Sequence, residues 1–154
     1  MNDEQRLVVE LPGLSLKNPV IAASGTCGYG REIASNYDLN RLGSLVMKST
    51  TLHPRSGNPR PRVCHTSAGW LNANGLQNVG VQRVVDEKIP WLQVNYPKLP
   101  VIASVAGFSN DEYVEVTDKL TTGGGVNALE LNVSCPNVKH GGLAMGTDPA
   151  VLED

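Results

Sequence analysis

The residues best suited to chemistry form one short cluster, Asn132-Val133-Ser134-Cys135-Pro136-Asn137. Asn132 and Asn137 each offer a carbonyl acceptor and amide donors, which suit the edge of a planar ligand that alternates C=O and N–H groups. Cys135 offers a thiol, and a free thiol has a pKa of roughly 8.5, close enough to neutrality to serve as a base or a nucleophile. The alternative for Cys135 is a buried structural cysteine beside a proline turn, because free cysteines are often buried.

Three further segments contain candidate residues. Lys48 follows the apolar run Leu45-Val46-Met47 at the expected end of a strand, where it would stabilise negative charge on a ligand or be a solvated surface lysine. The segment 71–78 carries three asparagines and a glutamine around a glycine, although Asn-Gly is primarily a turn signal. The small residues Ala23-Ser24-Gly25 allow a flat ring to approach the backbone, but they also terminate ordinary strands.

Composition limits the classes of function. The chain has 154 residues, of which 40% are hydrophobic and 18% charged, so we expect one soluble globular unit. A net charge of −2 provides no field for nucleic acid or anionic lipid, and aromatic residues for base stacking are scarce at 5%. The charged start MNDEQRLVVE does not resemble a secretory signal, and no run approaches the ~20 apolar residues of a membrane span, so we expect a cytoplasmic protein.

Cysteine and histidine spacing argues against disulfides and metals. Three widely spaced cysteines do not predict a disulfide framework. The three histidines are not placed with them at the spacing of metal ligands, so we predict no metal site. Arg55, Arg60 and Arg62 are interpreted as a solvated basic face, with attraction of an anionic substrate or a partner surface as the alternatives.

The pattern of apolar residues predicts alternating strands and helices. A hairpin is expected from residues 7–9 and 14–16, followed by strands at 19–25, 45–50, 99–105 and 128–134. Helices are expected at about 31–40, 81–94 and 111–120, with a further helix starting at 147–149. Ser109 or Asn110 should cap the third helix, and Pro90 should kink or end the second. Residues 51–80 form a long loop without clear periodicity, and such loops are usually functional.

This alternation is typical of an α/β fold with a parallel sheet. Residues 23–30 do not match the G-x-G-x-x-G spacing of a doubly wound nucleotide site, so a (β/α)8 TIM barrel fits better. Such a barrel needs ~250 residues, and residues 1–154 therefore supply an N-terminal hairpin and about four βα units, the N-terminal half of one barrel domain. In the strand at 128–134, Glu130, Asn132 and Ser134 share one face, and the active-site rim of a barrel lies where its strands end.

Four segments in register resemble dihydroorotate dehydrogenases over nearly the whole chain. They are Asn-Pro-Val-Ile-Ala-Ala-Ser-Gly at 18–25, Met-Lys-Ser-Thr at 47–50, Leu-Asn-Ala-Asn-Gly-Leu-Gln-Asn at 71–78 and Asn-Val-Ser-Cys-Pro-Asn at 132–137. Within this family, a cysteine at position 135 is similar to the soluble class 1 enzymes, whereas the membrane-bound ones use serine. Segments 71–78 and 137–142 look most like the catalytic subunit of the NAD-linked class 1B branch.

The resemblance implies an activity and residue roles. It implies that dihydroorotate is oxidised to orotate in de novo pyrimidine (UMP) biosynthesis, with Cys135 as the base for the C5 proton while the C6 hydride passes to N5 of FMN. Lys48 would touch both flavin and substrate. The implied substrate-binding residues are Lys48, Asn72, Ala73, Asn74, Gly75, Leu76, Asn132 and Asn137. The implied cofactor-binding residues are Ala23, Ser24, Gly25, Lys48, Ser49, Ser104 and Asn132, although the family commonly has asparagine where this chain has Ser104.

Partners and competing functions follow from the same resemblance. The NAD-linked branch implies a homodimer of the full-length chain with a second subunit that carries FAD and a [2Fe-2S] cluster.

A half-barrel leaves two open sheet edges and lacks the later strands that bind the flavin phosphate, so we expect the isolated chain to bind FMN weakly and to lack turnover. The alternatives are another FMN barrel, such as dihydropyrimidine dehydrogenase or a tRNA dihydrouridine synthase, and a truncated remnant that acts as an interaction partner.

Overall fold

The computed structural model of the chain describes residues 5–134 and 146–153. Its centre is a four-stranded parallel sheet whose spatial order follows the sequence, so each connection crosses from one strand to its neighbour. This arrangement confirms the predicted α/β fold built from the first units of a (β/α)8 barrel. The strands in order are β3 (Ile21–Ala22), β4 (Ser44–Val46), β7 (Val101–Val105) and β8 (Ala128–Leu131).

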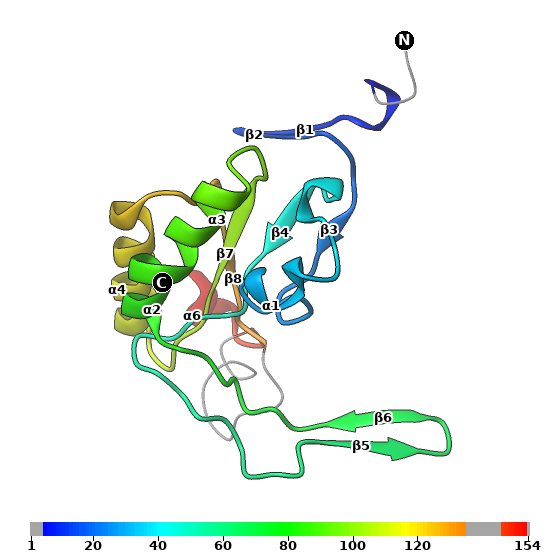
Figure 1. The fold of residues 1–154 in the computed structure, drawn as a ribbon. Helices are drawn as coiled ribbons and strands as arrows, with labels where there is room; N and C mark the ends of the chain where they lie inside the picture. The colour runs from blue at the N-terminus through cyan, green and yellow to red at the C-terminus, as the bar shows by residue number, and fades with distance from the viewer. Residues whose placement is uncertain (1–4, 135–145, 154) are drawn as a thin grey trace.

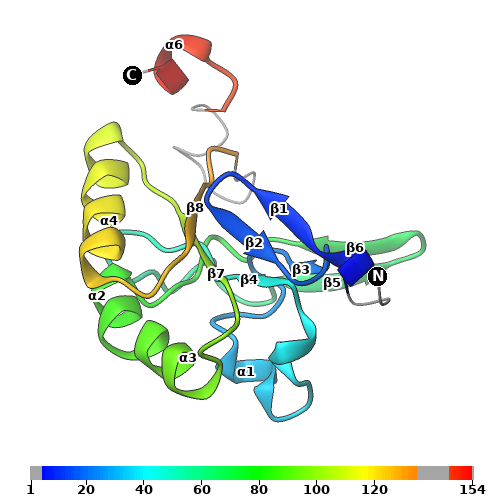
Figure 2. The ribbon, with the colours of Figure 1, turned by 90° about the horizontal axis from the view of Figure 1, so that it is seen from above.

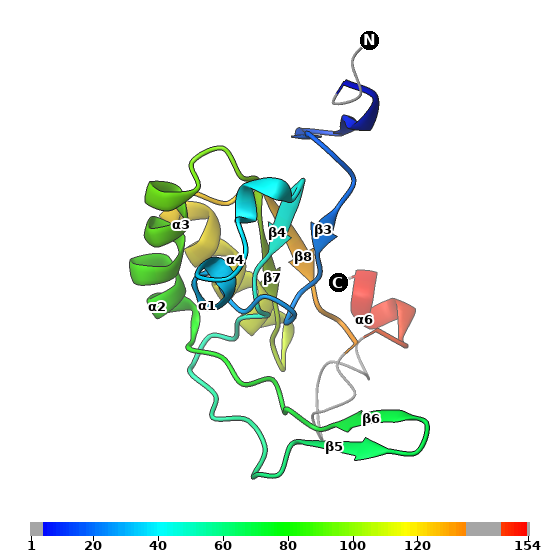
Figure 3. The ribbon, with the colours of Figure 1, turned by 45° about the vertical axis from the view of Figure 1, so that its right-hand side comes forward.

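The helices between the strands lie on one side of the sheet, and the short C-terminal helix α6 (Pro149–Glu153) lies on the other (Figures 1 and 3). The space between helices and sheet is filled by fully buried side chains such as Leu45, Val84 and Leu120. Each such side chain contributes roughly 1.5–3 kcal/mol by leaving water, so this layer holds the strands in register. The covering helices are α1 (Arg31–Ala34), α2 (Val81–Arg83), the π-helical η3 (Val84–Lys88), α3 (Ile89–Asn95) and α4 (Asn110–Gly123).

The predicted N-terminal hairpin is present but begins later than expected. A 3-10 turn, η1 (Gln5–Leu7), precedes strands β1 (Val9–Leu11) and β2 (Leu14–Leu16). Leu11 pairs with Leu14, so Pro12 and Gly13 form a two-residue turn that fixes where the strands start. The view from above shows this hairpin lying across one end of the sheet (Figure 2).

The helix expected at 31–40 is wrong in length. It is a single turn, α1, followed by the separate 3-10 turn η2 (Leu39–Arg41). The carboxylate of Asp38 accepts a hydrogen bond from the Asn40 amide at 2.9 Å, and this local bond starts a new turn instead of continuing the helix.

The long loop at 51–80 contains a hairpin that the sequence pattern did not predict, formed by β5 (Val63–Thr66) and β6 (Gly69–Asn72). Every residue of both strands is exposed, so no alternation of apolar residues could reveal them. Figure 1 shows the hairpin projecting from the end of the sheet opposite to β1 and β2.

The helix predicted at 81–94 does not run through Pro90 as one regular α-helix. The five-residue π turn η3 directly precedes α3, and Pro90 falls in the first turn of α3, where its missing N–H is tolerated. The predicted cap of α4 is confirmed, because Ser109 Oγ accepts from the Glu112 amide at 3.3 Å. Strand β8 ends at Leu131, three residues before the predicted end at 134. Within the two described stretches, we find no helix with the length and apolar character needed to cross a membrane.

Candidate active site

A cavity of about 620 Å³ lies at the carboxyl ends of the strands, on the side of the long loop. Two sets of residues form it. The floor comes from the strand ends, and its residues are Ser24, Gly25, Thr26, Lys48, Ser49, Glu130 and Asn132. The wall comes from the loop after β6, and its residues are Asn72, Asn74, Leu76 and Gln77.

Strand pairing that continues beyond β4 positions the centre of the floor. The Thr50 amide donates to Ser104 O at 2.8 Å, and the Ala106 amide donates to Thr50 O at 2.9 Å. These bonds extend the parallel ladder by one bridge, between Thr50 and Val105. Ser49 and Ser104 are therefore side by side, and both are only 1% exposed.

A row of hydroxyl groups crosses the floor. Ser49 Oγ lies 2.9 Å from Ser24 Oγ and 2.9 Å from Ser104 Oγ. Asn132 Nδ2 donates to Ser49 Oγ at 3.0 Å. The end of β8 is held as well, since Tyr113 Oη from α4 donates to the Asn132 carbonyl at 2.7 Å and the Asn132 amide donates to Val105 O at 2.8 Å. Asn132 is thus fixed at its amide, its carbonyl and its side chain.

The side-chain ammonium group of Lys48 lies close to Gly25 in the floor. The Lys48 amide donates to Gly28 O at 2.8 Å, which ties the end of β4 to the turn after β3. A Cβ atom on Gly25 would come within 3.6 Å of Lys48 Nζ, and Gly25 has a φ of +82°, which favours glycine. The absence of a side chain there leaves the backbone and the ammonium group accessible from the cavity.

The wall contains the one non-glycine residue with positive φ in the described part of the chain, Leu76, at +58°. A bulky residue in this conformation is strained and persists only where its surroundings hold it. Asn78 provides that support, because its buried side-chain amide donates to Leu76 O at 2.9 Å and to Thr51 Oγ1 at 2.8 Å. Its oxygen accepts from the amides of Thr51 and Gly80. Asn78 therefore connects the wall to the end of β4.

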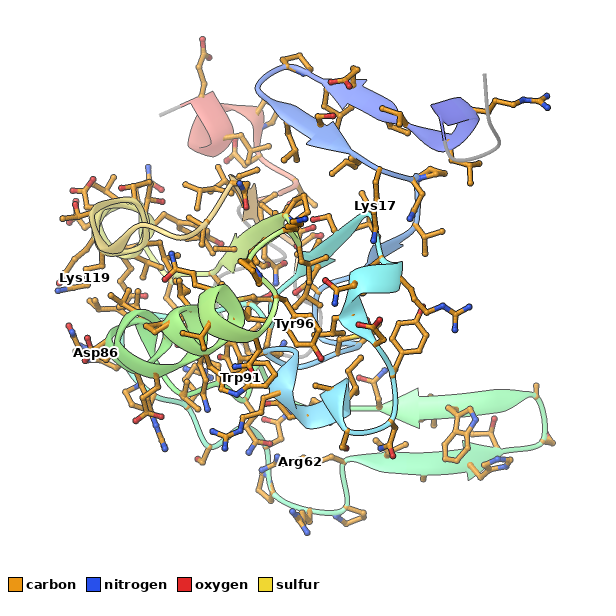
Figure 4. The ribbon with its side chains drawn as sticks, turned by 45° about the horizontal axis from the view of Figure 1, so that its top comes forward. Lys17, Arg62, Asp86, Trp91, Tyr96 and Lys119 are labelled. Atoms are coloured by element: carbon orange, nitrogen blue, oxygen red, sulfur yellow. The ribbon has the colours of Figure 1, made fainter. Side chains whose placement is uncertain are left out.

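Arg62 holds the other side of the wall. Its guanidinium donates to the carbonyls of Ser56 and Asn58 and to the side-chain oxygen of Gln77. Figure 4 shows Arg62 at the bend that leads into β5. Asn58 Nδ2 in turn donates to Ala73 O at 2.9 Å. The loop before β5 is thereby bound to the segment after β6.

The interpretation of the three arginines as one solvated face is wrong for two of them. Arg62 is half-buried in the contacts above, and half-buried Arg55 lies over the ring of Phe108, with Cζ 4.6 Å from the ring centroid. Arg60 alone of the three is exposed. The spacing of charges in the sequence could not separate these cases, because the partners of Arg62 and Arg55 are uncharged oxygen atoms and an aromatic ring.

Tyr29 lies beneath the junction of floor and wall. It is 5% exposed, and its hydroxyl faces Thr50 and the backbone of Val79 without hydrogen-bond geometry to either. Burial raises the pKa of Tyr29 above its ordinary value of 10.0, because the phenolate would be poorly solvated there.

Most of the predicted site residues meet at this cavity. Those that line it are Ser24, Gly25, Lys48, Ser49, Asn72, Asn74, Leu76 and Asn132. Four others do not line it, namely Ala23 in the turn after β3, Ala73 and Gly75 in the wall segment, and Ser104 behind Ser49. Cys135 and Asn137 lie outside the described residues. The individual binding roles remain predictions.

Several residues of this site were not among those to which the sequence assigned a binding role. Thr26, Gln77 and Glu130 line the cavity, and Asn78 and Arg62 hold its wall. The sequence predicted Glu130 on the same strand face as Asn132, because side chains alternate between the two faces of a strand. This alternation was the signal that could have identified Glu130 as a site residue. Gln77 and Asn78 belong to the candidate segment 71–78 and Arg62 to the predicted basic face, but no sequence signal indicated their supporting roles, because the partners of Arg62 and Asn78 are mostly backbone atoms.

The lining suits a planar ligand with polar edges. Hydroxyl, amide and ammonium groups offer donors to ring oxygen and nitrogen atoms, and Gly25 allows close approach of a ring. Within residues 5–134 and 146–153, no group of three or more histidine, cysteine or acidic side chains is placed to hold a metal ion.

Comparisons with known proteins agree with this geometry. A family model described as dihydroorotate dehydrogenase matches residues 6–154. The chain is 73% identical to dihydroorotate dehydrogenase A (fumarate) of Limosilactobacillus reuteri over 99% of this chain and 50% of the relative. It is 57% identical to the catalytic subunit of dihydroorotate dehydrogenase B (NAD(+)) of Streptococcus pneumoniae over 97% of this chain and 48% of the relative.

A solved structure shares the fold. The crystal structure of DHODH from Eimeria tenella in complex with ferulenol superposes with a TM-score of 0.77 at 21% identity, over 97% of this chain and 42% of that one. The chain spans about half the length of the curated relatives it matches.

Proposed function

The chain belongs to the dihydroorotate dehydrogenase family, and from this premise we propose that it forms the first half of an FMN-dependent enzyme that oxidises dihydroorotate to orotate in pyrimidine biosynthesis. One observation carries the proposal. Ser24, Lys48, Ser49 and Asn132 converge from the ends of β3, β4 and β8 on one cavity, opposite a wall rich in amides.

In this proposal the wall and Asn132 hold the pyrimidine substrate. Asn72, Asn74 and Asn132 offer amide donors and acceptors that match a ring edge of alternating C=O and N–H groups. Lys48 supplies a positive charge for the substrate carboxylate and for charge that develops in the reaction. Ala73, Gly75, Leu76 and Asn137 complete the proposed substrate site.

Cys135 is the proposed base. Oxidation of the C5–C6 bond requires removal of the C5 proton as hydride leaves C6, and a thiolate can take that proton at near-neutral pH. Cys135 follows Asn132 by three residues, and the three bonds that fix Asn132 anchor the start of that segment. The base and the hydride acceptor must lie on opposite faces of the substrate ring.

FMN is the proposed cofactor, and it supplies the hydride acceptor when bound. Its proposed binding residues are Ala23, Ser24, Gly25, Lys48, Ser49, Ser104 and Asn132, of which Ser104 acts through Ser49 because it does not line the cavity. Within this set, Gly25 leaves the backbone open to a ring, while Ser24 and Lys48 offer hydrogen-bond donors from the floor.

The test joins residues 1–154 to the second half of the Limosilactobacillus reuteri relative. We expect this joined enzyme to bind FMN stoichiometrically and to produce orotate from dihydroorotate. Cys135→Ala should lower the rate by about 10²-fold or more, as expected for loss of a general base. The isolated chain should bind FMN weakly and show no turnover. If the joined enzyme bound FMN but oxidised only another dihydropyrimidine, the proposal that dihydroorotate is the substrate would be wrong.

The final electron acceptor has two candidates. We propose that the acceptor is NAD⁺, which receives the electrons through a partner subunit with FAD and a [2Fe-2S] cluster. The support for this proposal is that segments 71–78 and 137–142 resemble the NAD-linked branch. Fumarate is the second candidate, and the name of the 73% identical relative favours it. Orotate formation by the joined enzyme with fumarate alone would select fumarate, whereas a requirement for the partner subunit and NAD⁺ would select the NAD-linked route. A homodimer of the full-length chain is proposed in both cases, and the mass of the native particle tests it.

A further inference from the structure

The row of hydroxyls in the floor has one arrangement of hydrogens that satisfies its buried groups. A serine hydroxyl donates one hydrogen bond and accepts up to two. Ser49 Oγ has three neighbours at hydrogen-bond distance, and one of them, Asn132 Nδ2, is a donor. Ser49 therefore accepts from Asn132 and has one further acceptor position and one hydrogen to share between Ser24 and Ser104.

Burial decides between the two directions. Ser104 is 1% exposed, and the one hydrogen-bond partner of its hydroxyl within the described ranges is Ser49. If Ser104 accepted from Ser49, its own hydrogen would be buried without a partner, which is unfavourable. If Ser104 donates, Ser49 accepts twice and passes its hydrogen to Ser24. Ser24 then has its own hydrogen left, and Ser24 lines the cavity.

We propose that Ser104, Ser49 and Ser24 form a hydroxyl chain with one direction, which presents the Ser24 hydroxyl to the cavity as a hydrogen-bond donor. Ser104 is a positioning residue in this chain, because it acts on a ligand through Ser49 and Ser24 and does not line the cavity. Successive hydroxyl bonds polarise one another, so the donor at Ser24 is stronger than that of an isolated serine. A ligand with an electron-rich acceptor atom is the class that this donor recognises.

The first test measures the direction and needs no ligand. In the isotope-labelled chain, buried hydroxyl protons exchange slowly enough to give NMR signals. We expect a nuclear Overhauser effect from the Ser49 hydroxyl proton to the β protons of Ser24. An effect to the β protons of Ser104 instead, or no slowly exchanging hydroxyl signal, would overturn the proposal.

The second test rests on the proposed FMN site and uses the joined enzyme. Ser104→Ala should weaken FMN binding about two- to tenfold, the effect of one hydrogen bond, and the loss should be larger for reduced than for oxidised FMN. A donor favours the more electron-rich form, so the reduction potential of the bound flavin should fall. Ser104→Thr, which keeps the hydroxyl, should restore both values.

The matched control is Ser44→Ala. Ser44 is a fully buried serine in the same sheet, and its hydroxyl donates to Pro100 O at 3.0 Å. The Ser44→Ala variant should lower thermal stability as Ser104→Ala does, without changing the affinity for FMN or the reduction potential of the bound flavin. Equal losses of affinity in both variants, or a larger loss for oxidised FMN, would refute the positioning role. Failure of the unmodified joined enzyme to bind FMN would instead reject the proposed function and leave the NMR result to decide the direction.

Discussion

The floor of the cavity is fixed by a continuous main-chain ladder, whereas its wall is held by isolated main-chain hydrogen bonds together with the side chains of Asn78 and Arg62. In the floor, strand pairing places Ser49 beside Ser104, and the serines add hydrogen bonds to a frame that already exists. In the wall, residues 73–77 form no continuous ladder. Single main-chain bonds join Ala73 to Arg62 and Asn74 to Asn58, and the side chains of Arg62 and Asn78 add the bonds to Gln77 and Leu76. Single substitutions should therefore disturb the wall much more than the floor.

The largest effect is expected for Asn78→Ala. This change leaves the amides of Thr51 and Gly80 and the carbonyl of Leu76 without their partner in a buried place. We expect the free energy of unfolding to fall by about 3 kcal/mol, as measured by chemical denaturation.

Asn95→Ala is the matched control for Asn78→Ala. Asn95 is exposed, and its side chain makes one bond, to Trp91 O at 2.8 Å, at the end of α3. Its removal should change the free energy of unfolding by no more than about 0.5 kcal/mol. If the two variants lost equal stability, the wall would not depend on Asn78.

An intermediate effect is expected for Arg62→Lys. A lysine has a single compact ammonium group and cannot reach the three acceptors that the guanidinium contacts together. The wall should loosen while the floor keeps its geometry, so the KM for dihydroorotate should rise about tenfold with kcat little changed in the joined enzyme. Arg60→Lys, at an exposed neighbour, should leave both constants unchanged. A fall in kcat at constant KM would argue against a role limited to the wall.

The smallest effect is expected for Tyr29→Phe, beneath the junction of the two regions. Near pH 7 the loss of a buried hydroxyl without a hydrogen bond should change stability by less than about 0.5 kcal/mol. Because burial raises the pKa of Tyr29 above 10.0, the folded chain keeps this proton longer than the unfolded chain does, and stability is lost as pH rises beyond 10.0. Denaturation near pH 7 and near pH 11 should show a smaller alkaline loss in the variant; an unchanged loss would exclude Tyr29 as its source.

The same contrast explains what could be predicted from the sequence. The strands and the residues at their ends follow from apolar runs and from the rule that parallel strands end at one edge, so Lys48 and Asn132 were found, while Ser49 followed from the family resemblance. The hairpin of β5 and β6 was missed because all its residues are exposed and no burial pattern marks it. The supporting roles of Arg62 and Asn78 were not predicted, although Asn78 lies in the candidate segment 71–78, because side chains that bond to backbone atoms leave no periodic signal. The position of Ser104 behind Ser49 was not predicted either.

The π turn before Pro90 has a consequence for the phase of its helix. Val84 and Ile89 both face the core, although they are five residues apart. At the 100° per residue of a regular α-helix, a five-residue step would rotate Ile89 by about 140° away from Val84, towards solvent. The turn of η3 contains more residues than an α-helical turn, so each residue rotates the helix less and Ile89 stays on the same face as Val84. The buried residues therefore form one continuous stripe, although their spacing in the sequence changes from three residues to five. Deleting one residue between Val84 and Ile89 would leave a four-residue step, which at 100° per residue is a rotation of only about 40°, so a regular α-helix would keep Ile89 and Leu92 facing the core without the π turn.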